Sequence, residues 1–82
     1  MENYIVDIKE GKIKLFIDEV EVGYVLFKIS LDKFNILSTI VYEQFKGKGY
    51  AKKLMNYILE YTTKNKLVLE YTCSYANNYF NK

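Results

Sequence analysis

The 82-residue sequence contains no histidine, no proline and no tryptophan, and all twelve of its basic side chains are lysines. Without histidine, the chain lacks the usual general base, the commonest metal ligand and the usual partner of a catalytic serine or cysteine. Without arginine, it lacks the bidentate fork that reads guanine or clamps a carboxylate. These absences argue against a metal centre, a histidine-based triad and base-specific reading of nucleic acid.

The chain has a single cysteine, Cys73, which permits neither an internal disulfide nor a zinc cluster. A reduced, cytoplasmic setting is therefore the expectation. No stretch resembles a signal peptide, and no apolar run approaches the roughly 18 residues that a membrane span needs. The formal net charge of +2 is too small to indicate nucleic-acid or membrane binding. We expect neither among the partners.

Apolar material is plentiful, with a hydrophobic fraction of 50% and an aromatic fraction of 17%. Because linkers, repeats and low-complexity runs are missing, residues 1–82 are predicted to form one domain. A domain of this size buries only about 60% of the surface that its unfolded chain exposes. Nine tyrosines carry much of the aromatic content, and a tyrosine can bury its ring while its hydroxyl stays in water. The small core and the tyrosines make a homodimer a candidate state.

The first half of the sequence predicts β-strands joined by short turns. Gly11 marks one turn, and Gly23 inside a strand indicates a bulge. In the second predicted strand Ile13, Leu15 and Ile17 fall on one face. Short connections predict an antiparallel meander. The four predicted strands are Tyr4–Lys9, Lys12–Ile17, Val22–Ile29 and Asn35–Tyr42, with the second and third turns at Asp18–Glu21 and Leu31–Phe34.

The pattern changes to helical spacing from Gly49 onward, where apolar residues recur every three or four positions. Asn65 is expected to end this helix, because asparagine tolerates the left-handed conformation. Leu67–Tyr71 follows as a fifth strand, and Cys73–Tyr79 as a short helical turn. The predicted fold is α+β: a mainly antiparallel sheet of about five strands, one long helix after the fourth strand and a short C-terminal helical turn.

A glycine-bearing loop at Gln44–Ala51 carries the strongest functional signal. It follows a strand and opens directly into the predicted helix, whose first N–H groups have no internal partners and suit a phosphate. Glycines let the backbone approach such a ligand closely. A Walker A loop is excluded by spacing, and a dinucleotide fingerprint would need a third glycine where Lys52 stands.

The run Gln44-Phe45-Lys46-Gly47-Lys48-Gly49 resembles the Q/R-x-x-G-x-G/A pyrophosphate-binding motif of the GCN5-related N-acetyltransferases, and Tyr50-Ala51-Lys52-Lys53-Leu54 continues as the helix of that family does. Within the family, Ile13–Tyr79 is similar to the very short YjdJ-type acetyltransferase-like proteins. These proteins carry a hairpin, the motif loop, one long helix and a strand that ends in Cys-Ser-Tyr, here Cys73-Ser74-Tyr75.

The resemblance implies acetyl-coenzyme A or coenzyme A as cofactor and an unidentified amine as acetyl acceptor. It implies that pantetheine lies along the strand near Val41 and Tyr42. It also implies two catalytic candidates, Tyr75 as the acid that protonates the leaving thiolate and Cys73 beside the reacting sulfur. The implied pyrophosphate-binding residues are Gln44, Phe45, Lys46, Gly47, Lys48, Gly49, Tyr50 and Ala51.

The sequence also departs from the family. Full-length members have two early helices that help to form the acceptor site, and this chain is too short for them. Close relatives carry a histidine where Ser38 stands and an acidic residue near Ile40, so no general base is evident. Two alternatives to an N-acetyltransferase therefore remain open: a non-catalytic module that binds coenzyme A or acyl-coenzyme A, and a small protein-interaction domain that uses its tyrosine-rich surface.

Overall fold

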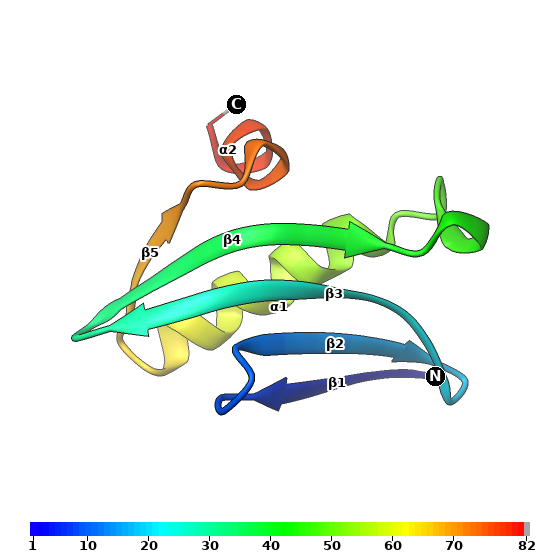
Figure 1. Ribbon diagram of the computed structural model, residues 1–82, viewed down its shortest axis with the longest axis horizontal. Coiled ribbons are helices and arrows are strands. Elements are labelled where there is room, and N and C mark those ends of the chain that lie inside the picture. Colours follow the sequence, from blue (N-terminus) through cyan, green and yellow to red (C-terminus); the bar gives the residue numbers. More distant parts are fainter. Residues whose placement is uncertain (82) are drawn as a thin grey trace.

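The structure is a computed structural model, and it describes residues 1–81. Five strands form one sheet in the order of the sequence, and the first four pair antiparallel. Figure 1 shows helix α1 lying across one face of this sheet. The strands are β1 (Glu2–Asp7), β2 (Lys12–Ile17), β3 (Val20–Ser30), β4 (Lys33–Val41) and β5 (Val68–Tyr71), and the helices are the 3-10 turn η1 (Glu43–Phe45), α1 (Tyr50–Lys64) and α2 (Ser74–Phe80).

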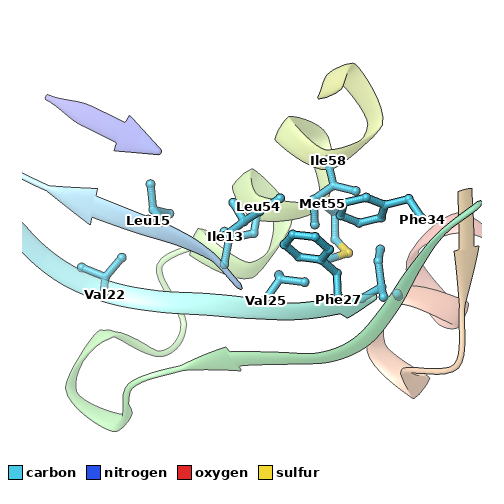
Figure 2. Close-up of a cluster of buried hydrophobic side chains, with 11 residues drawn as sticks. Ile13, Leu15, Val22, Val25, Phe27, Phe34, Leu54, Met55 and Ile58 are labelled. Carbon is cyan, nitrogen blue, oxygen red and sulfur yellow. The ribbon is translucent and has the colours of Figure 1, made fainter. Parts of the chain in front are cut away.

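The core lies between this sheet face and the inner face of α1 (Figure 2). Phe34 of β4 is fully buried and stacks on Phe27 of β3, with ring centroids 4.5 Å apart. The helix contributes the expected stripe of apolar residues, since its 3.6-residue period places them on one side. The buried apolar residues are Ile13, Leu15, Val22, Val25, Phe27, Phe34, Ile36, Leu54, Met55, Ile58 and Ala76.

The predicted α+β class, the five strands, the long helix and the C-terminal helical turn are confirmed, but several boundaries were wrong. β1 runs from Glu2 to Asp7 rather than from Tyr4 to Lys9. Its turn begins early because Asp7 accepts hydrogen bonds from the Glu10 and Gly11 amides at 2.9 Å. Together these bonds close the chain reversal before Lys9.

Strands β3 and β4 extend further than predicted because their turns are tighter. Asp18 and Glu19 take φ values of 50° and 71°, and Leu31 takes 59°, all in the left-handed region. Such backbone suits a two-residue hairpin, and glycine or asparagine is its usual sequence signal. The predicted turns Asp18–Glu21 and Leu31–Phe34 were therefore too long.

The bulge predicted near Gly23 is present, and Gly23 has a second role. The β2–β3 register shifts between Leu15, opposite Gly23, and Phe16, opposite Glu21. A Cβ on Gly23 would lie 2.4 Å from the Ile40 carbonyl oxygen, so only glycine permits this approach of β3 to β4. A second register shift in the β3–β4 pair, between Leu26 and Phe27, was not predicted.

Helix α1 ends at Lys64, as predicted within one residue, but for a different reason. Asn65 has φ −95° and donates from Nδ2 to the Tyr61 carbonyl at 2.8 Å. The left-handed residue is Lys66, with φ 55°.

No helix within residues 1–81 is long and apolar enough to cross a membrane.

The one parallel pair in the sheet, β4 with β5, ends early and positions the candidate site. Its ladder runs only from Lys33 opposite Val68 to Ile36 opposite Tyr71. There the Thr72 and Cys73 amides both donate to the Ile36 carbonyl, at 3.0 and 3.3 Å. Figure 1 shows the chain then diverging from β4 into α2. Among residues 1–81, no strand pairs with this edge of β4 beyond residue 36.

Candidate functional site

A cleft of about 400 Å³ opens where β4 loses its neighbour. Its floor is the unpaired edge of β4, one end is the glycine loop with the start of α1, and α2 contributes a wall. Peptide groups alternate in direction along a strand. The Tyr42 amide donates to the Val22 carbonyl of β3 at 3.0 Å. The peptide groups of Val41 and Thr39, one and three positions earlier, therefore point the other way and face the cleft. The lining residues are Thr39, Val41, Phe45, Lys46, Gly47, Gly49, Tyr50, Ala51, Lys52 and Tyr75.

The glycine loop presents unpaired backbone donors at the end of the cleft. Gly47 and Gly49 have φ values of 80° and 82°, which L side chains rarely adopt. A Cβ on either glycine would meet nothing within 4 Å, so the space beside them is open. The first hydrogen bond of α1 runs from the Lys53 amide to the Gly49 carbonyl at 3.1 Å, and no side chain caps the helix. The amides of residues 50–52 therefore have no acceptor within the helix.

Lysines add positive charge around these donors. Lys46 pairs with Glu43 at 3.3 Å, and Lys53 pairs with Glu2 at 2.5 Å, away from the cleft. Lys52, which lines the cleft, and Lys48 form no ion pair with any carboxylate of residues 1–81. Their charges and the positive end of the helix dipole act in the same direction, and together they favour an anion such as a pyrophosphate.

Cys73 lies at the end of the cleft away from the loop, where it contacts β4. Its Sγ is 3.6 Å from Oγ1 of Thr39, which is within hydrogen-bonding distance for sulfur. Burial raises the pKa of the Cys73 thiol, but hydrogen bonds from the Ala76 backbone and from Thr39 outweigh it, so the pKa falls below its ordinary value. The thiol is therefore partly ionised at a lower pH than a free cysteine.

Alkylation of Cys73 tests this environment. We expect the rate of reaction with iodoacetamide to reach half its maximum at a lower pH than for a free cysteine, because only the thiolate attacks. Removing the Thr39 hydroxyl in Thr39→Val should move the midpoint upward, since that group stabilises the thiolate. A midpoint at or above the value for free cysteine would contradict the assignment.

Tyr75 forms a wall of the cleft from the first turn of α2, and 39% of it is exposed. Its ring stacks on Tyr79 at a centroid distance of 6.3 Å. Burial, with a smaller contribution from Tyr79, raises the pKa of the Tyr75 hydroxyl above its ordinary value. At neutral pH the hydroxyl is protonated and can donate a hydrogen bond or a proton.

The fold agrees with the comparisons to known proteins. The GCN5-related N-acetyl-transferase family matches residues 12–82. The chain belongs to this family. A GCN5-like protein from Staphylococcus aureus aligns with a TM-score of 0.73 at 21% identity, covering 96% of this chain and 78% of that one. The narrower assignment to the YjdJ-type branch stays a prediction, and no curated protein matches the chain.

Two longer structures of acetyltransferases share the fold. The PaiA N-acetyltransferase of Thermoplasma acidophilum, solved with coenzyme A, has a TM-score of 0.62 at 20% identity over 68% of this chain. The ribosomal-protein-alanine N-acetyltransferase of Brucella melitensis biovar Abortus 2308 has a TM-score of 0.68 at 19% identity over 76%. The chain spans only 35% and 52% of these two proteins, so at this identity they show the fold alone.

Most of the site residues predicted for this N-acetyltransferase family member line one cleft. Those that do are Val41, Phe45, Lys46, Gly47, Gly49, Tyr50, Ala51 and Tyr75. Four others do not line it. Gln44 and Lys48 are exposed in the loop, and Cys73 lies behind Thr39. The Tyr42 hydroxyl donates to Glu21, which raises the pKa of Tyr42 to about 12.

Two lining residues, Thr39 and Lys52, were not among the predicted site residues. The family resemblance placed Val41 in the site. Thr39 precedes Val41 by two positions, so strand alternation could have added it. Lys52 lies in the first turn of α1, where a lysine near the unpaired amides was a usable signal. Both residues add a polar side chain to a cleft that is lined mainly by apolar residues and glycines.

A larger open hollow of about 850 Å³ lies near the start of β1 and the β2–β3 turn. Residues such as Phe16, Asp18 and Glu19 line it, without a glycine loop or a helix N-terminus. Residues 1–81 also contain no group of three histidine, cysteine or carboxylate side chains that could hold a metal ion. The cleft beside β4 is therefore the candidate site.

Proposed function

We propose that this chain is an acetyl-coenzyme A-dependent N-acetyltransferase that acts on an amine. The observation that carries the proposal is the position of the cleft. It has an unpaired strand edge as its floor, and unpaired helix amides at one end. Acetyl-coenzyme A carries phosphates, amides and a thioester in that order along its length. This order matches the helix amides at one end of the cleft and the strand edge that follows. A cytoplasmic location, with an unidentified amine as acceptor, belongs to the same proposal.

The residues present fit coenzyme A along the length of the cleft. The amides of Gly47–Lys52 would hold its pyrophosphate, because they are unpaired and the space beside the two glycines is open. Lys46 and Lys52 would contribute charge. The outward-facing peptide groups of Thr39 and Val41 would bind the pantetheine amides in the way that a neighbouring strand would.

The thioester supplies an activated acetyl group when acetyl-coenzyme A is bound. In this proposal Tyr75 donates its phenolic proton to the departing sulfur as the C–S bond breaks and the C–N bond forms, and water then returns a proton to Tyr75. No carboxylate lines the cleft, so the acceptor amine loses its own proton to solvent. The chain therefore acts mainly by holding the donor in place and protonating the leaving group.

The variant Tyr75→Phe tests the role of the hydroxyl. We expect kcat for acetyl transfer to fall by about 100-fold or more, the lower end of what a positioned general acid contributes. The affinity for coenzyme A should change little, since the ring remains. Thiol release in the presence of a panel of amines measures the rate.

Tyr79→Phe is the matched control, because Tyr79 is in the same short helix but donates to Asn56 of α1. An unchanged rate in Tyr75→Phe would exclude the hydroxyl as the acid. Saturable binding of acetyl-coenzyme A with no thiol release across the panel would favour the non-catalytic binding module. No binding at all would leave only the small interaction domain.

A further inference from the structure

Thr39 lines the cleft at the end away from the loop, and Cys73 lies directly behind it. The β4–β5 ladder stops where Thr72 and Cys73 both donate to Ile36. Just beyond that point Sγ of Cys73 reaches across to Oγ1 of Thr39, 3.6 Å away. This contact bridges β4 and the residue that precedes α2. The gap between them is therefore blocked at the depth of Thr39.

The protein core lies behind this contact. Cys73 packs against the buried cluster, and Ile36 and Ala76 of that cluster are both fully buried. A chain that extended past Thr39 would have to displace the thiol or open the core. Close-packed interiors resist such insertion.

The cleft is small for a ligand pocket. Its volume of about 400 Å³ is near the lower end of the usual range for ligand pockets, roughly 300–1,000 Å³. A donor whose pyrophosphate is at Gly47 and Gly49 would direct its acyl end along β4, past Val41 toward Thr39. The acyl group would then meet the Thr39–Cys73 contact, with Tyr75 beside it.

We propose that the Thr39–Cys73 contact sets the maximum length of the transferred acyl group and restricts the donor to short acyl thioesters, acetyl or propionyl. This inference rests on the proposed function and specifies its donor. Thr39 and Cys73 act here through their bulk, as residues that determine specificity. An added methylene in a closed pocket is worth about 10- to 200-fold in discrimination.

Calorimetric titration with coenzyme A and its acetyl, propionyl, butyryl and hexanoyl thioesters tests the proposal. For the wild type we expect butyryl-coenzyme A to bind at least ~10-fold more weakly than acetyl-coenzyme A. In Cys73→Ala and in Thr39→Ala, the ratio of the two affinities should approach one. Cys73→Ser is the matched control: it keeps most of the volume without the thiol, and should keep the discrimination.

Three outcomes are distinct. Equal wild-type affinities for acetyl- and butyryl-coenzyme A would overturn the proposal, as would discrimination that persists in both alanine variants. If one alanine variant fails to fold by circular dichroism, the other, on the opposite side of the gap, decides the result. If coenzyme A itself does not bind the folded wild type at millimolar concentration, the proposed function fails, and the length limit fails with it.

Discussion

Replacing Gly49 with asparagine will weaken coenzyme A binding by about 100-fold or more while the fold is retained. Gly49 has φ 82°, and asparagine is one of the few side chains that tolerates this conformation. Its side chain would enter the open space beside the unpaired amides of α1. A hydrogen bond to a charged group contributes about 1.5–3 kcal/mol, so the loss of two such bonds removes a factor of about 100 or more.

Lys66→Asn is the matched control for this variant. Lys66 also has a left-handed backbone, with φ 55°, but it follows the far end of α1. Lys66→Asn should therefore leave the affinity for coenzyme A unchanged. Calorimetry measures the affinity, and chemical denaturation verifies that both variants are folded. If Gly49→Asn binds coenzyme A within about threefold of the wild type, the loop does not hold the phosphates.

Replacing Phe34 with alanine will remove about 3–5 kcal/mol from the free energy of unfolding. Phe34 is fully buried, stacks on Phe27 at 4.5 Å and lies 6.0 Å from the Tyr61 ring. A chain of 82 residues has a total stability of roughly 4–12 kcal/mol. The variant therefore loses a large share of that total.

Phe16→Ala provides the comparison for Phe34→Ala. Phe16 is in β2 with its side chain half-buried, and it is outside the buried cluster. Phe16→Ala should lower the free energy of unfolding by clearly less than Phe34→Ala, since fewer contacts are removed. Urea denaturation followed by circular dichroism measures both variants. Equal losses for the two would mean that the core between the sheet and α1 does not dominate stability.

The main elements of this fold could be predicted from residue patterns. Ile13, Leu15 and Ile17 alternate, and the apolar stripe of α1 repeats at helical spacing, so burial on one face determines both. The turns could not be located as well. Leu31 takes a left-handed backbone that no local signal indicates, because the pairing of β3 with β4 imposes it.

The site was predictable where it is local in sequence. The loop residues Gly47 and Gly49 carry their own signal, since left-handed backbone favours glycine at each position. The contact of Cys73 with Thr39 was not predictable, because the two residues are 34 positions apart and meet only where β5 leaves β4. Such a contact depends on where a parallel ladder ends, which tertiary packing decides.

Nuclear magnetic resonance titration of the ¹⁵N-labelled chain with coenzyme A tests the central claim most directly. We expect the largest amide shifts at Gly47, Gly49 and residues 50–52, with further shifts at Thr39 and Val41. The β1–β2 hairpin, on the far edge of the sheet, should change little. Shifts concentrated at that hairpin, or no shifts at millimolar coenzyme A, would contradict a coenzyme A site in the cleft beside β4.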